Sequence, residues 1–345
     1  MSTNLRHLGF QSAFNPRKLD DNDIGFTKGE IAIPIYESSY KDMTAVTMES
    51  EILKVVLIPD SGGKIQSIVD TRFDKELLVQ RDDVRYRRSS YDSEYASGDV
   101  SGFDEVFPSI EPCYFPRSPW QGIRIPDHGE VWALPWRFQY EDDSLSMQVH
   151  GVRFPYTLEK TLAFIRDDTL KITYKATNLS DFEFPFLWAP HALWLCESDT
   201  RIVLPQSIKR VMSTCSVQNR LGPFGTIHEW PKCTIEGEPY EIDRVYPKYP
   251  NKCEKYYALG EIEEGWCALR NENTGYAVKL SYPIDKVPFL GVWEGIMNGK
   301  YVTALEPCTA AYDALDTAMQ WQRARSIPSL TTEEWFLTIS VGNLI

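Results

Sequence analysis

Two histidines and one glutamate are the residues of this sequence best suited to acid–base chemistry. His128 follows a Pro-Asp pair at the start of a tryptophan-rich run, and His191 follows a proline between two tryptophans. Glu306 precedes a proline in a third motif. An imidazole titrates near neutral pH and a carboxylate can act as a base, so the three could move a proton between two oxygen atoms. Each residue alone is more often a packed or solvated side chain, and only their combination suggests a site.

Two other chemistries fit these residues less well. Two histidines and a carboxylate are the ligand types of a non-haem iron site, but no His-x3-His pair occurs, and Glu130 beside His128 has no second histidine near it. The seven cysteines are scattered without a Cys-x-x-Cys pair, which indicates reduced thiols rather than disulfides. Cys196 and Cys308 lie near the motifs, but cysteines in such apolar surroundings are normally inert. We therefore expect no metal site.

Composition and charge exclude several classes of partner. The net charge of −13 argues against binding to nucleic acid or to an anionic membrane, because such binding needs a basic surface. The one basic cluster, Arg81 to Arg88, is interrupted by aspartates and is typical of a solvated loop. The N-terminus lacks the apolar run of a signal peptide, and the segment 184–196 is too short to span a bilayer. We expect a cytoplasmic protein.

The segments that must position the three residues have the residue pattern of β-strands. Residues 170–177 alternate apolar and polar side chains with the two-residue period of a half-buried strand. Similar patterns occur at 51–59, 156–165, 276–283 and 334–341, and only 311–324 has a helical pattern. Since 22 prolines and 20 glycines punctuate the chain, the sequence predicts an all-β protein, a large antiparallel β-sandwich. We expect a single domain over 1–345, with 1–45 as an irregular leader or an added strand pair.

Four segments together resemble one known family. The segments 57–80, 127–136, 170–194 and 304–315 are similar, in order, to motifs of the galactose mutarotase-like, or aldose 1-epimerase, superfamily. The resemblance implies the family's large β-sandwich with a shallow sugar cleft. It also implies an isomerase that exchanges the α and β anomers of a sugar without a cofactor. By this resemblance His191 is the acid that protonates the ring oxygen, Glu306 is the base, and His128 holds the sugar.

The chain departs from the galactose enzymes ahead of the first histidine. Their Asn-Arg segment is replaced by 101–113, which resembles an uncharacterised branch of the superfamily. In this segment Asp104 and Glu105 are candidates for contacting sugar hydroxyls, and bracing a loop is an equally good interpretation of both. Loss of the arginine leaves galactose and glucose in doubt as substrates. The acid–base set itself is not affected.

Further residues suit a carbohydrate ligand. Trp136 and Trp293 could stack on a pyranose, although core packing is the commoner use of tryptophan, and Trp188 suits the core best. Arg124 and the Arg81 to Arg88 cluster are the obvious donors for a phosphate. Two alternatives therefore stay open: a mutarotase for a hexose 6-phosphate or other acidic sugar, and a carbohydrate-binding protein without catalysis. The expected partner is a small-molecule sugar, and a homodimer is also compatible with the sequence.

Overall fold

The computed structural model describes residues 34–217, 219–245, 253–297 and 299–344. The fold given below is that of the unit Ala32–Ile345. Most of the leader that we expected over 1–45 lies outside the described residues. The described part of it contributes β1 (Ile35–Tyr40) and the start of β2 (Met43–Glu49), which pair with each other.

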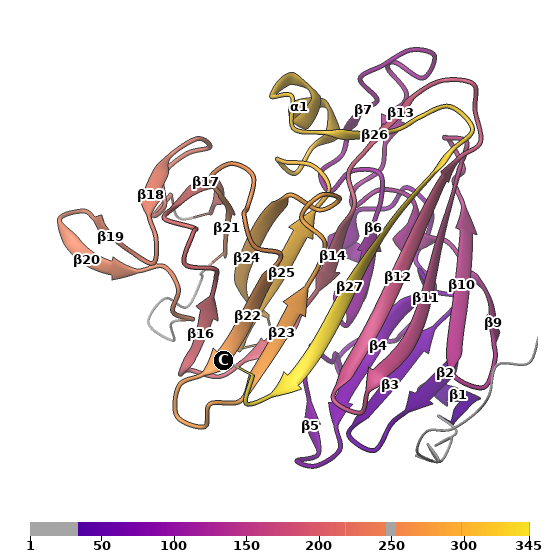
Figure 1. Cartoon of the computed structure of the whole chain (residues 1–345), viewed down its shortest axis with the longest axis horizontal. Coiled ribbons are helices and arrows are strands. Elements are labelled where there is room, and N and C mark those ends of the chain that lie inside the picture. Colours follow the sequence, from indigo (N-terminus) through magenta and orange to yellow (C-terminus); the bar gives the residue numbers. More distant parts are fainter. Residues whose placement is uncertain (1–33, 218, 246–252, 298, 345) are drawn as a thin grey trace, which may run out of the picture. The chain divides into compact units, whose positions relative to one another are not determined.

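Antiparallel sheets make up the described chain, which confirms the predicted all-β fold (Figure 1). One sheet has seven strands: β1, β2, β3 (Leu53–Ile58), β4 (Lys64–Asp70), β5 (Lys75–Glu76), β6 (Phe103–Val106) and β14 (Ala189–Ala192). A second sheet has eight strands: β9 (Arg137–Tyr140), β10 (Ser144–His150), β11 (Tyr156–Arg166), β12 (Thr169–Asn178), β16 (Thr200–Val203), β22 (Trp266–Asn271), β23 (Ala277–Ser281) and β27 (Thr332–Gly342).

A third sheet has six strands: β15 (Trp194–Cys196), β17 (Arg210–Ser216), β18 (Ile227–Glu229), β21 (Cys253–Ala258), β24 (Phe289–Met297) and β25 (Lys300–Cys308). The remaining strands form three pairs: β7 (Cys113–Tyr114) with β8 (Arg124–Ile125), β13 (Phe184–Phe186) with β26 (Arg325–Ile327), and β19 (Lys232–Ile235) with β20 (Glu238–Glu241). The helical elements are α1 (Leu315–Gln320) and the 3-10 turns η1 (Tyr95–Ser97) and η2 (Val131–Ala133). No helix in the described ranges is long and apolar enough to cross a membrane.

Each strand predicted from alternation is present. The pattern at 170–177 lies within β12, whose apolar side chains are buried while its intervening polar ones are partly exposed. The other four patterns coincide with β3, β11, β23 and β27. The one helical pattern gives a shorter element than its length suggests, because α1 covers only Leu315–Gln320. All seven cysteines are free thiols, as their spacing predicted.

The sheets pack in layers around a core that includes buried charges. Glu105 on β6 and Lys160 on β11 are both fully buried, and their side chains form an ion pair of 3.0 Å between the seven-stranded and eight-stranded sheets. Tyr174 of β12 and the Trp188 indole donate hydrogen bonds to the same Glu105 carboxylate. Because buried charge is stable only when it is fully paired, this network fixes how the two layers face each other.

Candidate active site

Strands β14 and β25 bring His191 and Glu306 opposite each other. Hydrogen bonds pair Trp194 with Thr303 beyond one end of β14, and Trp188 with Thr309 beyond the other. Both pairs have the same register, and β14 and β25 are in contact between them. β14 and β25 belong to different sheets, and the register of the two flanking pairs, extended between them, aligns His191 with Glu306.

His191 and Glu306 belong to a row of side chains that runs across neighbouring strands, and this row continues beyond each of them. Across β6, His191 pairs with Asp104, and the neighbouring pair of Phe103 with Ile65 places Lys64 next in line. In the other direction Glu306 pairs with Gly291. The sequence motifs that carry His191, Glu306 and Asp104 are therefore neighbouring strands that present these three side chains on one face.

His128 joins this row from a loop. Its ring centroid lies 4.8 Å from that of His191, and Tyr95 of η1 stacks on His128 with ring centroids 4.0 Å apart. The imidazole Nδ1 of His128 lies 2.8 Å from Asp127 Oδ1, which fixes the orientation of the ring. The structure therefore brings together all three residues expected to do the acid–base chemistry, and it adds a tyrosine, Tyr95, that contacts both histidine rings.

A tight turn presents His128. Both His128 and Gly129 have positive φ, 57° and 75°, a conformation that is uncommon for a residue other than glycine. The His128 amide donates to the Ile110 carbonyl, and a Cβ on Gly129 would lie only 2.0 Å from the Phe107 carbonyl oxygen. The glycine after the histidine is needed because this turn packs directly against another backbone segment.

Glu306 is fully buried and held through one oxygen. Its Oε2 forms an ion pair with Lys255 Nζ, which also lies 2.8 Å from Asp313 Oδ1. Tyr257 donates a hydrogen bond of 2.8 Å to that same Asp313 oxygen. The second oxygen, Glu306 Oε1, is buried without a hydrogen-bond partner in the described chain.

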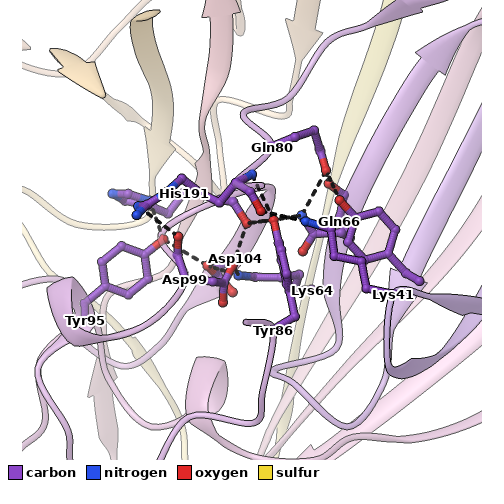
Figure 2. Close-up of polar contacts among 12 residues, drawn as sticks. Lys41, Lys64, Gln66, Gln80, Tyr86, Tyr95, Asp99, Asp104 and His191 are labelled. Atoms are coloured by element: carbon purple, nitrogen blue, oxygen red, sulfur yellow. Dashed lines mark hydrogen bonds and ion pairs between the residues drawn. The ribbon is translucent and has the colours of Figure 1, made fainter. Parts of the chain in front are cut away.

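Asp104 is held in a closely similar way (Figure 2). Its Oδ2 lies 3.2 Å from Lys64 Nζ, and this lysine is also 2.7 Å from Asp99. Tyr95 donates a hydrogen bond of 2.9 Å to Asp104 Oδ2. Asp104 Oδ1 has no partner among the residues that the structure describes. His191 thus lies between two buried carboxylates, each anchored by a lysine through one oxygen and unpaired at the other.

Burial dominates the electrostatics of these groups. It lowers the pKa of His191 well below its ordinary value, and the nearby His128 and Lys255 lower it further. Burial, opposed by Lys64 and assisted by Asp99, raises the pKa of Asp104 to about 6. Burial also raises the pKa of Glu306 above its ordinary value of 4.5, although Lys255 counteracts it. Near neutral pH, His191 is therefore a neutral imidazole, which holds no excess proton.

Three other residues expected at the site lie elsewhere. Asp104 and Glu105 are consecutive in β6 and point to opposite faces, so Glu105 enters the core network with Lys160. Trp136 is a core side chain whose indole donates to the Val131 carbonyl, and Arg124 is ion-paired with Asp92. A fourth residue, Trp293 on β24, is half-buried and lies directly across the sheet from Lys255 of β21, which holds Glu306.

Several residues of the site could not be predicted from their residue type or sequence context. Lys64, Tyr95, Lys255 and Asp313 have ordinary residue types in unremarkable strand or loop contexts. Lys64 and Asp313 lie inside two of the family-like segments, which is the one signal that could have found them. In the described ranges no group of three or more His, Cys, Asp or Glu side chains is arranged to hold a metal ion.

Comparison with solved structures identifies the fold of this chain. A galactose mutarotase-like protein from Lactobacillus casei superposes with a TM-score of 0.62 at 16% identity, over 86% of this chain and 100% of that one. A candidate aldose 1-epimerase from Klebsiella pneumoniae gives 0.64 at 14% identity, over 86% and 79% of the two chains. A candidate aldose 1-epimerase from Escherichia coli K12 gives 0.59 at 18% identity, over 90% and 100%. The chain therefore has the galactose mutarotase-like fold, as the four motifs predicted.

Sequence comparisons add little beyond the fold. A family model described as a domain of unknown function, DUF5107, matches residues 36–121, a range that contains β2 to β7 and all of β1 except its first residue. No curated protein matches the sequence.

Proposed function

We propose that this protein catalyses the exchange of α and β anomers of a sugar, with His191, Glu306 and His128 as the catalytic set. The observation that carries the proposal is that Glu306 on β25, one of whose carboxylate oxygens is buried without a partner in the described chain, lies on a strand in contact with the His191 strand β14. A buried acceptor without a partner is costly, and such groups in a native structure are commonly reserved for a ligand or for catalysis. The fold supports the same class of reaction.

The reaction needs one base and one acid on the two oxygens bonded to C1. Glu306 Oε1 removes the proton from the C1 hydroxyl while a proton passes from His191 to the ring oxygen. The bond between C1 and the ring oxygen breaks, and a free aldehyde forms. Rotation about C1–C2 presents the other face of the aldehyde, and the ring closes again with both proton transfers reversed. His128, fixed by Asp127, binds the sugar beside the ring oxygen.

The unpaired carboxylate oxygens of the site are buried, whereas His128 is partly exposed. Both oxygens, Asp104 Oδ1 and Glu306 Oε1, are shielded from water, and Tyr95 lies against both histidine rings. Exclusion of water in this way strengthens the electrostatic interactions inside the site.

A screen of single anomers tests the activity. Freshly dissolved α and β forms of neutral aldoses and acidic sugars are followed by proton NMR or polarimetry with and without the protein. We expect accelerated mutarotation of at least one sugar. Saturable binding of a sugar without any acceleration would instead identify a carbohydrate-binding protein.

A specific observation also favours an acidic sugar as the substrate. Arg85, Arg87 and Arg88 line a pocket of about 600 Å³ together with serines of the segment 89–97. The pocket wall includes Asp99, whose carboxylate binds Lys64 of the catalytic row. Guanidinium groups and hydroxyls are suitable donors for a phosphate oxygen.

Comparing neutral and phosphorylated anomers of one sugar tests this second candidate. If the pocket binds a phosphate, Arg87→Ala and Arg88→Ala should raise KM for the phosphorylated sugar roughly tenfold and leave the neutral sugar unaffected. Arg166→Ala is the control, because Arg166 is an exposed residue paired with Asp168 outside this pocket. Equal KM values for all variants would show that the arginines do not bind the substrate.

A further inference from the structure

The acid side of the proposed reaction needs a source for its proton. His191 is buried and neutral near neutral pH, because burial, His128 and Lys255 all disfavour its charged form. A neutral imidazole can donate a proton from one ring nitrogen only if the other nitrogen receives one at the same time. The residue that contacts the other nitrogen therefore matters for the chemistry.

Tyr95 makes that contact and links His191 to Asp104. The Tyr95 hydroxyl lies 2.9 Å from Asp104 Oδ2 and 3.4 Å from His191 Nδ1 (Figure 2). The second distance is long for a resting hydrogen bond, but such contacts tighten when a substrate binds. A phenol has a single hydrogen, so Tyr95 can donate to only one of these two partners at a time.

We propose that Asp104, Tyr95 and His191 form a proton relay in which the protonation state of Asp104 sets the tautomer of His191. The inference rests on the proposed function for its catalytic meaning, whereas the tautomer change itself is a property of the free protein. Asp104 and Tyr95 are positioning residues in this account, because they act on the sugar through His191.

The relay has two states. When Asp104 carries a proton it donates to the Tyr95 oxygen, Tyr95 donates to His191 Nδ1, and the hydrogen of His191 resides on Nε2. When Asp104 is ionised Tyr95 donates to it and accepts from His191 Nδ1–H, so Nε2 becomes an acceptor. The first state can protonate a sugar ring oxygen, and the second can deprotonate the hydroxyl that closes the ring.

Proton transfer along the relay balances over one turnover. In ring opening Nε2–H goes to the ring oxygen, the Tyr95 proton goes to Nδ1, and the Asp104 proton goes to the Tyr95 oxygen. Ring closure reverses the three transfers and restores the proton to Asp104. Glu306 takes and returns the proton of the C1 hydroxyl independently on the other side of His191.

Charged groups on neighbouring elements act on both ends of the relay. Asp104 faces Lys64 on β4, Asp99 in the loop after η1, and Tyr95. His191 is influenced by His128, Lys255 and Lys64. Glu306 also acts on Tyr95. Lys64 holds the ionised form of Asp104 in place, and burial together with Asp99 favours the protonated form, so both states are within reach of ordinary pH.

Nitrogen NMR of histidine-labelled protein tests the relay without any substrate. The two ring nitrogens of a neutral histidine have different shifts as donor and as acceptor, and His191→Asn identifies the His191 signals. We expect His191 to stay neutral and to exchange its donor and acceptor nitrogens between about pH 5 and about pH 7, as Asp104 loses its proton. Asp104→Asn and Tyr95→Phe should remove this exchange, whereas Tyr91→Phe should retain it. Tyr91 lies in the same segment but donates to Glu130.

Kinetics with a turned-over sugar separates the two proposals. Tyr95→Phe should lower the rate roughly 10²-fold and remove the limb of the pH–rate profile that belongs to Asp104. Tyr91→Phe should retain both the wild-type rate and that limb. A tautomer that stays the same across this pH range, or that still changes in Asp104→Asn, overturns the relay even if anomer exchange is observed. A tautomer exchange of the expected kind in a protein that accelerates no sugar's mutarotation supports the relay and overturns the proposed function.

Discussion

Two buried carboxylates with similar surroundings define the site at the scale of single residues. Glu306 and Asp104 are each held by a lysine through one oxygen, and each lysine is held by a second aspartate. A buried carboxylate without a cation would be protonated, so each lysine determines the charge of its carboxylate. In the proposed mechanism the two lysines therefore affect the rate, although neither has to touch the sugar.

Lys255→Met should lower the rate at neutral pH roughly 10- to 10³-fold. Loss of the ammonium raises the pKa of Glu306 further, since an adjacent opposite charge is worth about 1–3 pKa units. The base is then protonated over a wider range, so the ascending limb of the pH–rate profile should move to higher pH and the maximum rate should fall. Lys255→Arg keeps the positive charge and should retain most activity. A pH–rate profile of Lys255→Met that coincides with the wild type would contradict this role.

The wild-type pH–rate profile should be a bell with its maximum on the acidic side of neutrality. Glu306 must be ionised, so the rate rises with pH through its pKa, which lies above the ordinary 4.5. Asp104 must carry a proton in the relay, so the rate falls as pH rises through about 6. Both limbs belong to the coupled site rather than to either carboxylate alone. Measured kcat that keeps rising through pH 8 would exclude Asp104 as the source of the proton.

Rare residue types and motifs indicated some residues of this site from the sequence alone, whereas residues of common types gave no such signal. Histidine is rare here, so His128 and His191 stand out, and Glu306 stands out through its motif. Lys255 and Tyr95 belong to residue types that are common on strands and loops. Their importance comes from burial beside a carboxylate, which is a property of the folded chain. The same holds for Glu105, which enters the core because β6 turns it away from Asp104.

At the scale of elements, strand register and one turn create the site. The register of β14 against β6 aligns His191 with Asp104, and the register of β15 against β25, extended to β14, aligns His191 with Glu306. Alternation along a sequence predicts which strands exist, and all five such predictions are confirmed, but it does not predict which strands far apart in sequence pair. The turn that presents His128 is a local feature, and its Asp-His-Gly sequence made it visible.

Gly129→Ala should destabilise the protein by roughly 2–5 kcal/mol, the sum of a left-handed backbone and a steric clash. The added Cβ would lie 2.0 Å from the Phe107 carbonyl oxygen. Gly122→Ala is a matched control with φ of 84° and no atom within 4 Å of the added Cβ. It should cost only roughly 1–2 kcal/mol. Urea denaturation measures the free energy of unfolding of both variants. Equal losses of stability would show that the close approach to Phe107 is unimportant.

At the scale of the whole described chain, buried charge between sheets holds the layers that support the site. Glu105 and Lys160 join the seven-stranded and eight-stranded sheets within the core. The all-β fold was predictable because proline, glycine and alternating residues occur along the full sequence. The division into three large sheets, and the continuity between two of them at β14, depend on long-range pairing and were not predictable.

Lys160→Met should destabilise the protein by about 3–5 kcal/mol, because it leaves the buried Glu105 carboxylate without its cation. Lys175→Met is the control on the neighbouring strand β12, where the ion pair with Glu334 is largely exposed. That change should cost less than about 1 kcal/mol. Chemical denaturation of the two variants compares them directly, and a small loss for Lys160→Met would mean that the layers do not depend on this pair.

The central claim is that Glu306 removes the proton from the C1 hydroxyl of a sugar. The most direct measurement is the mutarotation rate of a single anomer, followed by proton NMR, for the wild type and for Glu306→Gln. Glutamine keeps the shape of the side chain and removes its basicity, so we predict a rate lower by roughly 10²- to 10⁴-fold with little change in sugar affinity. A folded Glu306→Gln variant that exchanges anomers at nearly the wild-type rate would contradict the mechanism.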